Sequence, residues 1–579
     1  MTSRNHLVGR ADRLLATACG QGEGWVWLLA TARVANVAAV LLLPAWLGKV
    51  VDGLVSGRGG AGPLVSCAVL VVVIVAGEVL ADVAVGGSTA SATAWLRRAL
   101  IGRLLSIGPR ATAAFEPGDL VSRVVGNAAQ TGRGGVAVVR SAAALVPSVG
   151  SVVALLLIDP WLALAFLAGL LVMLVALRGF LRENSASIAA YQRSQGRIAS
   201  RLTGALGGAR TIAAAGTADR ETERVLEPLP ELRAHGRAMW RSQERAATQS
   251  ALVMPGVEVL VLAVAGWAVV SGRMTPGELF AASRYAALGT GITSLVGFLN
   301  LLAASRGGAR RCQELLDVAG TEHGERDLPP GLGRLQFRAV TAREGDRTLL
   351  DGIDLTIPPG RTLAVVGHSG AGKSVLAALA GRLRDPDFGE VLLDRMPLTS
   401  LDRDTLRGQV TYAFERPALI GDTVGEALAM GRELDGSTLR RGAEVATADD
   451  FVRRLPEGYD NELDTTTLSG GEVQRLGLAR AFADTGRLLV LDDATSSVDT
   501  VTEMRVSSVL TGHLGRRTRM IIAHRAATAA RADLVAWLEN GALRAMDTHQ
   551  RLWGEPDYRA VFEPRGRGAR GLAAEAESA

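Results

Sequence analysis

The stretch Gly367-His-Ser-Gly-Ala-Gly-Lys373-Ser374 decides how the second half of the chain folds. It ends the short apolar run Arg361–Gly367 and is followed by an Ala/Leu-rich helical pattern. This is the pattern G-x-x-x-x-G-K-[ST] in a strand–loop–helix context, which predicts a phosphate-binding loop. The backbone N–H groups of such a loop close around phosphate oxygens, and the helix N-terminus adds partial positive charge. We expect phosphate contacts from Gly367, His368, Ser369, Gly370, Ala371, Gly372, Lys373 and Ser374.

Two side chains of this loop have more specific expected roles. Lys373 is expected to reach the β- and γ-phosphates, and Ser374 to ligate Mg²⁺. The chain has only two lysines, Lys49 and Lys373, and every other basic side chain is Arg. Lys373 is therefore the only lysine of the second half.

A second apolar run, Leu488–Leu491, ends in Asp492-Asp493. Four apolar residues that lead into an acid place that acid at the end of a buried strand, where open α/β sheets bind their ligands. Taken alone, the pair could be a solvated acidic turn. Beside a phosphate-binding loop, we expect Asp492 to hold Mg²⁺, through water.

The first half is dominated by apolar runs. The chain is 48% hydrophobic and 21% charged, with a mean hydropathy of +0.21. A membrane-spanning helix needs about 20 mostly apolar residues. One such run could be a buried helix of a soluble protein, but six favour a membrane domain. The six runs are Gly24–Leu47, Leu64–Ala84, Ala137–Ile158, Trp161–Leu177, Ala247–Val270 and Leu279–Ala303.

Basic residues indicate the orientation, because short loops rich in Arg stay in the cytosol. Most arginines of this half follow runs two and four, whereas the links after runs one, three and five hold little beyond Arg58 and Arg273. We expect a multi-pass protein of the cytoplasmic (inner) membrane, in contact with the lipid bilayer, with both termini in the cytosol. Residues 1–23 hold no long apolar run, so neither a cleaved signal peptide nor a leader-cleaving peptidase is expected.

Charge and cysteines exclude other classes. The net charge of +5 is modest for 579 residues and does not favour nucleic acid as a partner. The three cysteines, Cys19, Cys67 and Cys312, are far apart and predict neither disulfides nor a metal site.

These patterns predict an all-α transmembrane domain of six helices with long cytosolic helical loops, followed by an α/β ATPase domain with a phosphate-binding loop. The loops after runs two and four show helical periodicity over about 50–70 residues, and such helices would project tens of Å below the bilayer. The expected divisions are an N-terminal segment (1–23), the transmembrane domain (24–318), a linker (319–334), the nucleotide-binding domain (335–563) and a disordered tail (564–579).

The most specific motif lies between the phosphate-binding loop and Asp492. Leu468-Ser469-Gly470-Gly471-Glu472, followed by the helical pattern Val473–Arg480, resembles the signature of ABC-transporter ATPases, usually LSGGQ. The residues Ser497-Val498-Asp499 resemble the D-loop of that family. His524 resembles its H-switch, although without these motifs it would be taken for a core histidine. The resemblance implies an ATPase that binds ATP and Mg²⁺.

The first half resembles the exporter type of the same family. Phe115 with the motif Gly118–Arg123 resembles the opening of the first cytosolic loop, Gly208–Ile212 its counterpart in the second, and Met274–Leu279 the entry to the sixth span. Six spans and one ATPase domain imply a half-transporter that pairs with a second half-transporter. In the family, the ATP sites form between the P-loop of one domain and the signature of the other, so Leu468–Glu472 would act on the partner's site.

Three positions depart from the family pattern. Asp493 stands where the family has a Glu that polarises the attacking water, and Glu415 stands where it has the Gln of the Q-loop. Glu415 can still meet Mg²⁺, but it adds negative charge beside the γ-phosphate. No aromatic residue lies near Val340–Glu344 to stack on adenine, so Arg343 is the only candidate plane.

These three departures lie on the P-loop side. A fourth, the stretch Asn461–Thr467 before the signature, is short and lacks the usual Gly-Glu-Arg-Gly, whereas the signature itself is intact. The favoured hypothesis is a heterodimer in which this chain supplies a slow ATP site and a signature that completes the site of a different partner, one with Glu after its Walker B Asp. Two alternatives stay open: a homodimeric exporter with slow Asp sites, and an ATP-gated channel or regulatory subunit. A soluble nucleic-acid ATPase and an importer are disfavoured.

Charges within the apolar runs suggest a path for the transported substrate. Arg33 and Glu258 lie about 14 and 16 Å into runs one and five at 1.5 Å per residue, and charges at such depth are costly unless they are paired or face water. We expect them to pair or to line a cargo cavity; the alternative is that they only stabilise helix contacts. A small amphipathic metabolite, a modified peptide and a lipid all remain possible cargoes.

Overall fold

The computed structural model describes residues 2–57, 60–289, 293–495 and 517–563. The chain divides into two compact units, one of residues 1–103 and 116–318 and one of residues 104–115 and 319–579. The expected D-loop residues Ser497 and Asp499 and the expected tail 564–579 lie outside the described residues.

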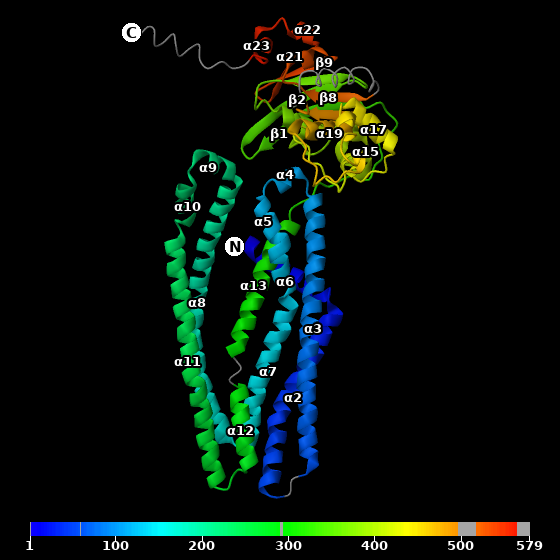
Figure 1. Cartoon of the computed structure of the whole chain (residues 1–579). Coiled ribbons are helices and arrows are strands. Elements are labelled where there is room, and N and C mark those ends of the chain that lie inside the picture. Colours follow the sequence, from blue (N-terminus) through cyan, green and yellow to red (C-terminus); the bar gives the residue numbers. More distant parts are fainter. Residues whose placement is uncertain (1, 58–59, 290–292, 496–516, 564–579) are drawn as a thin grey trace, which may run out of the picture. The chain divides into compact units, whose positions relative to one another are not determined.

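The described part of the first unit is built from helices (Figure 1). These are α1 (Thr2–Gly20), α2 (Glu23–Val55), α3 (Ala61–Ser106), α5 (Pro117–Ser122), the π-helix Arg123–Asn127, α6 (Ala128–Gly132), α7 (Gly134–Ile158), α8 (Pro160–Gly207), α9 (Ala209–Ala215), α10 (Ala218–Leu226), α11 (Leu229–Val270), α12 (Pro276–Gly289) and α13 (Thr293–Leu316).

Three of these helices are much longer than a bilayer is thick. Helices α3, α8 and α11 have 46, 48 and 42 residues, which is roughly 60–70 Å at 1.5 Å per residue. Helix α8 runs from the fourth apolar run into the expected cytosolic segment and packs along α11 (Figure 1). The expectation that the long loops are helical extensions of the spans is therefore confirmed.

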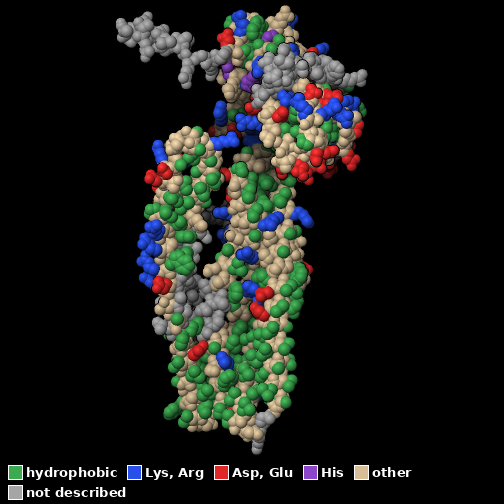
Figure 2. Space-filling model, in the orientation of Figure 1, with side chains coloured by type: hydrophobic (Ala, Val, Ile, Leu, Met, Phe, Trp, Pro, Cys, Tyr) green, Lys and Arg blue, Asp and Glu red, His purple; other side chains and the backbone are tan. Residues whose placement is uncertain are grey.

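Among the described residues, four segments are long and apolar enough to cross a membrane: Glu23–Val55, Ala61–Ser106, Pro117–Ile158 and Val253–Val270. They contain runs one to three and most of run five. The fourth run appears as the shorter apolar helix Pro160–Val172, and the sixth extends over α12 and α13, between which residues 290–292 are not described. Figure 2 shows hydrophobic side chains gathered at the lower end of these helices, with charged side chains farther up, as expected of a surface that faces lipid at that end.

Two glycines let α2 and α12 approach closely. A Cβ on Gly277 would lie 2.1 Å from the carbonyl oxygen of Gly48, so neither position has room for a side chain. Asp52 of α2 accepts hydrogen bonds from the backbone N–H of Gly277 and the hydroxyl of Thr275, both at 2.8 Å. The carboxylate satisfies donors at the start of α12 that would otherwise be left unpaired.

The second unit contains two sheets. One is antiparallel with the order β2-β1-β4-β5, and the other has the order β10-β9-β3-β8-β7-β6. In the latter, β9, β3, β8, β7 and β6 run parallel and β10 returns antiparallel to β9. The strands are β1 (Leu335–Glu344), β2 (Arg347–Ile357), β3 (Thr362–Val366), β4 (Phe388–Leu393), β5 (Met396–Pro397), β6 (Val410–Phe414), β7 (Leu488–Asp492), β8 (Thr518–Ile522), β9 (Leu534–Glu539) and β10 (Ala542–Asp547).

Short helices surround the sheets of this unit. They are α4 (Pro109–Thr112), α14 (Lys373–Ala380), α15 (Arg403–Gln409), α16 (Val424–Ala429), α17 (Gly436–Val445), α18 (Asp449–Val452), α19 (Gly470–Ala483), α21 (Ala526–Ala530), α22 (His549–Leu552) and α23 (Pro556–Ala560), with 3₁₀ turns at Leu398–Ser400 and Gly458–Asp460.

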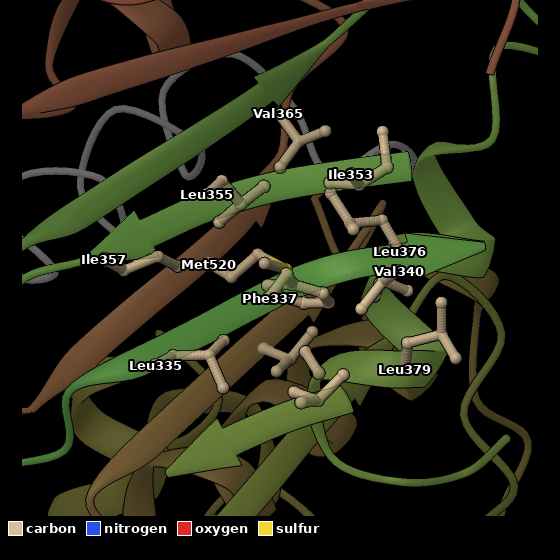
Figure 3. Close-up of a cluster of buried hydrophobic side chains, with 14 of the residues drawn as sticks. Leu335, Phe337, Val340, Ile353, Leu355, Ile357, Val365, Leu376, Leu379 and Met520 are labelled. Carbon is tan, nitrogen blue, oxygen red and sulfur yellow. The ribbon is translucent and has the colours of Figure 1, made fainter. Parts of the chain in front are cut away.

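Three apolar clusters are buried in the described part of this unit, and two of them surround the sheet edge of interest. The larger fills the space between the two sheets around α14, with Phe337, Ile353, Leu376 and Met520 among its members (Figure 3). The smaller joins α16–α19 to β6 and β7. Strands β3 and β7 read as continuous apolar runs because buried parallel strands are covered on both faces. The expected all-α first half and α/β second half are both confirmed.

Candidate functional site

Four parallel strands deliver four of the expected groups to one edge of the sheet. Strands β3, β8, β7 and β6 are neighbours in that order. They end directly before Gly367, Ala523-His524, Asp493 and Glu415, respectively. Because the carboxyl ends of parallel strands share an edge, residues far apart in sequence become neighbours there. Asp492 has Asp493, Glu415 and His524 as electrostatic neighbours.

The loop after β3 has the backbone shape that a phosphate requires. Gly370 and Gly372 have φ angles of 84° and 97°, in the left-handed region that favours glycine. A Cβ on Gly372 would lie 2.8 Å from the carbonyl oxygen of Leu349. The loop therefore stays open only with glycine at this position.

Lys373 begins α14 and is 7% exposed. Its Nζ donates to the carbonyl oxygens of Gly367 and His368, at 2.8 and 3.1 Å. Burial lowers the pKa of Lys373, while the carboxylates of Asp493 and Asp492 act in the opposite direction. The ammonium group is thus held by two backbone carbonyl oxygens of the loop, and phosphate oxygens could replace them as acceptors.

Asp492 and Ser374 are brought into contact. The pKa of Asp492 is raised by burial and then by the charge of Asp493, while a hydrogen bond with Ser374 acts to lower it. The buried Oδ1 of Asp492 has no hydrogen-bond partner in the described structure. A buried oxygen left unpaired beside a hydroxyl is a donor set that suits Mg²⁺, which is usually bound by one or two carboxylates together with substrate phosphates. No cluster of three or more His, Cys, Asp or Glu capable of holding a metal occurs among the described residues.

Asp493 faces His524. The distance from the His524 Nε2 to the Asp493 Oδ1 is 2.8 Å. The backbone of Asp493 has φ 53°, a left-handed conformation that Asp adopts more readily than most side chains. The orientation of the Asp493 carboxylate is therefore fixed by its left-handed backbone and by its contact with His524.

Gln474 ties the expected catalytic positions to the signature helix, and sequence reasoning did not single it out. This side chain of α19 is 1% exposed, and its amide donates to the backbone carbonyls of Glu415 and Asp493 at 3.2 and 3.3 Å. A polar residue in the apolar stretch after the signature was the available signal, because such a residue is buried only when it has partners.

The signature forms the N-terminus of α19. Ser469 is the N-cap, and Ser469 and Glu472 form a reciprocal capping box. The Glu472 Oε2 accepts from the backbone N–H and hydroxyl of Ser469, at 2.8 and 2.7 Å. These bonds lower the pKa of Glu472. Ser469 and Gly470 remain exposed at the tip.

Replacing Glu472 with alanine is expected to lower the thermal midpoint of the full chain in detergent by a few degrees, since a lost cap costs about 1 kcal/mol. Glu472→Gln should lower the midpoint less than Glu472→Ala does, because an amide oxygen can accept the same bonds although it carries no charge. The folded-state pKa of Glu472 is lowered, so its carboxylate adds stability at neutral pH that is lost as the pH falls below about 4. Equal losses in the two variants would contradict the capping role.

The family models agree with this geometry. The model described as "ABC transporter" matches residues 350–496, and the model "ABC transporter transmembrane region" matches residues 26–292. A relative from Streptomyces coelicolor, "ABC transporter ATP-binding protein RamA", is 45% identical over 542 residues, which is 92% of this chain and 84% of that protein. The chain belongs to the ABC transporter family.

A second relative matches over a smaller part of its own length, and a solved structure matches over nearly all of both chains. The "Multidrug efflux ATP-binding/permease protein Rv0194" of Mycobacterium tuberculosis is 32% identical over 70% of this chain and 35% of that protein. The structure of a bacterial Atm1-family ABC exporter with ATP bound covers 95% of this chain and 98% of that chain with a TM-score of 0.76 and 24% identity. This ABC transporter thus has a fused transmembrane and ATP-binding architecture, is a multi-pass membrane protein and carries the exporter fold.

Arg343 is the residue expected to stack on adenine in this ABC transporter. In the structure its guanidinium lies over the ring of Phe388. Its guanidinium carbon is 5.2 Å from the ring centroid of Phe388, which is 59% exposed. The strand pairing of Thr341 with Phe388 brings that ring beside β1, so an aromatic residue absent from the local sequence is supplied by β4. The contact with adenine stays a prediction.

Of the two expected arrangements of Arg33 and Glu258, the pairing is not found among the described residues, and the cargo cavity stays a prediction. Arg33 of α2 forms a two-pronged ion pair with Glu78 of α3, at 2.7 and 3.1 Å. Helices α2 and α3 are consecutive, so their polar positions meet directly. Arg33 lines a cavity of about 420 Å³ whose described lining does not include the half-buried Glu258.

Proposed function

We propose that this chain is one half of a heterodimeric ABC exporter that moves a small molecule, a peptide or a lipid across the cytoplasmic membrane. The two halves would sandwich ATP between the P-loop of one and the signature of the other. Closure of the cytosolic domains would travel through the long helices and open the cavity outwards. Hydrolysis, mainly at the partner's site, would reset it.

The observation that carries the proposal is the place of Asp493. It stands where we expect the catalytic carboxylate, with a side chain one methylene shorter than Glu, and its Oδ1 is 2.8 Å from the Nε2 of His524. Loss of about 1.5 Å of reach in a general base typically costs orders of magnitude in rate, because proton transfer needs hydrogen-bond distance. The capped signature helix, in contrast, is intact and would complete the partner's site.

Magnesium fits the same edge. Ser374 and Asp492 would hold the ion, with Glu415 near it, and the ion would offset the charge of the phosphates as they separate. Lys373 would bind the β- and γ-phosphates. His524 would lie beside the γ-phosphate, next to Asp493. Similarity to a multidrug efflux protein of Mycobacterium tuberculosis supports transport out of the cell as the direction.

The experiment compares this chain alone with this chain purified together with a candidate partner, such as a half-transporter encoded beside it that carries Glu after its Walker B Asp. We expect the pair to hydrolyse ATP at least tenfold faster. Changing the partner's Glu to Gln should return the pair to the slow rate of the single chain. Comparable turnover with and without the partner would defeat the heterodimer in favour of a homodimer.

Transport in sealed inside-out vesicles distinguishes an exporter from a channel. The pair should accumulate cargo against a gradient in the presence of ATP. Equilibration without accumulation would identify a nucleotide-gated channel and contradict export.

A further inference from the structure

Two cavities in the first unit share one arginine. The first, about 420 Å³, is lined by α2, α3 and α7 with Leu288 and Phe298, and includes Arg33, Glu78 and Arg140. The second, about 680 Å³, lies among α3, α7 and Leu301 and includes Arg97, Arg133 and Arg140. Because Arg140 lines both, the cavities adjoin. We call them together the arginine groove.

The arginine groove has an excess of positive charge. Its lining holds four arginines and one carboxylate, Glu78. Glu78 is paired with Arg33, and Asp82 contacts Arg140 at 3.2 Å from outside the lining. Arg33 and Arg140 lie within apolar runs one and three, where a charge is costly unless it is paired or faces water, whereas Arg97 and Arg133 lie between runs two and three, in the expected cytosolic segment.

The other two arginines have no acidic partner among the described residues. Arg97 donates to the backbone carbonyls of Val124 and Val125, both at 3.3 Å, which leaves its charge uncompensated. The side chain of Arg133 lines the groove and forms no hydrogen bond or ion pair with any described residue. The groove therefore attracts anions.

Several buried donors along the groove are unused. The Nε atoms of Arg33 and Arg140 and the hydroxyls of Ser148 and Thr93 are buried without a hydrogen-bond partner. An unpaired buried polar group is unfavourable until a partner reaches it, which agrees with a ligand that accepts hydrogen bonds. Guanidinium groups bind phosphate and carboxylate oxygens in a forked geometry.

The walls between these donors are apolar. Val40, Pro147 and Phe298 line the first cavity, and Val85, Val136 and Leu301 line the second. Each cavity lies in the size range of small-ligand sites, about 300–1,000 Å³. An apolar wall beside cationic donors matches a molecule with an anionic group at one end and a hydrocarbon chain at the other.

We propose that the arginine groove binds the anionic headgroup, a phosphate monoester or a carboxylate, of an amphiphilic cargo. This inference rests on the proposed export function and names the class of cargo. Arg133 and Arg140 contact the headgroup, and the apolar walls hold the first part of the tail.

The test measures binding without ATP and without a partner, on the full chain in phosphatidylcholine nanodiscs. Dioctanoyl phosphatidic acid is the probe, and native mass spectrometry counts the bound molecules. We expect saturable binding, a five- to tenfold loss of affinity in Arg133→Gln and at least a tenfold loss in the Arg133→Gln/Arg140→Gln double variant. Arg133→Gln removes a side chain that has no protein partner, so it leaves no orphaned group.

Arg98→Gln is the matched control, because Arg98 is an exposed arginine of α3 that lines neither cavity; it should bind like the unaltered chain. Inorganic phosphate should compete only weakly, since it lacks the tail. Equal binding by the double variant, equal binding of dioctanoyl phosphatidylcholine, or full displacement by millimolar phosphate would each overturn the proposal. If the probe fails to bind while the paired chains still accumulate cargo, the headgroup proposal is rejected and the export function stands. If the probe binds but the paired chains do not accumulate cargo, the export function is rejected and the anion site stands.

Discussion

The Lys373→Ala variant is expected to bind ATP at least a hundredfold more weakly than the unaltered chain. Lys373 is buried at the start of α14, and its Nζ is held by two carbonyl oxygens of the loop that phosphate oxygens would replace. Charge-assisted hydrogen bonds are the strong ones, and a hundredfold change corresponds to about 2.7 kcal/mol. Equilibrium titration of the full chain with a fluorescent ATP analogue measures the effect.

The chain offers a matched control for this variant. Lys49, the only other lysine, lies in α2 with its Nζ 4.4 Å from the ring centroid of Trp46. Lys49→Ala removes the same charge and should leave the affinity for ATP unchanged. If Lys373→Ala bound the analogue as tightly as Lys49→Ala, the loop after β3 would not be the nucleotide site.

The Asp493→Glu variant is expected to hydrolyse ATP at least tenfold faster than the unaltered chain when each is purified alone. The added methylene extends the carboxylate by about 1.5 Å, towards the position from which a general base reaches the attacking water. The gain has a small cost in stability, because Glu fits the left-handed backbone at φ 53° less well than Asp does. Phosphate release in the steady state gives the rate.

Asp493→Asn is the companion variant. Asn is as tolerant as Asp of the left-handed backbone, so the fold is kept while the negative charge is lost. Residual hydrolysis should disappear in this variant. An Asp493→Glu chain no faster than the unaltered one would mean that reach does not limit the site.

Local motifs predicted the edge of the sheet well. The glycine spacing, Lys373 and the apolar runs before Gly367 and Asp492 are each read from a few adjacent residues, and the parallel order of β3, β8, β7 and β6 then brings their ends together. Hydropathy likewise predicted long membrane helices, because a bilayer demands continuous apolar surface over a fixed length.

Contacts between distant segments were not predictable in the same way. Phe388 reaches Arg343 only through the pairing of β1 with β4. Arg33 pairs with Glu78 because of the relative position in which α2 and α3 pack. The depth of a residue within its apolar run does not predict that position. Gln474 acts through two backbone carbonyls, and backbone acceptors carry no signature in the sequence.

The position of Gln474 has a consequence for communication between two ATP sites. It lies four residues after Gly470 on the same 14-residue helix, α19. The N-terminus of that helix carries the signature offered to a partner, and its buried amide fixes the main chain at Glu415 and Asp493. ATP binding at the partner's site would therefore change the main-chain position of Glu415 and Asp493 in this chain. A small rotation of α19 as a rigid body would be enough.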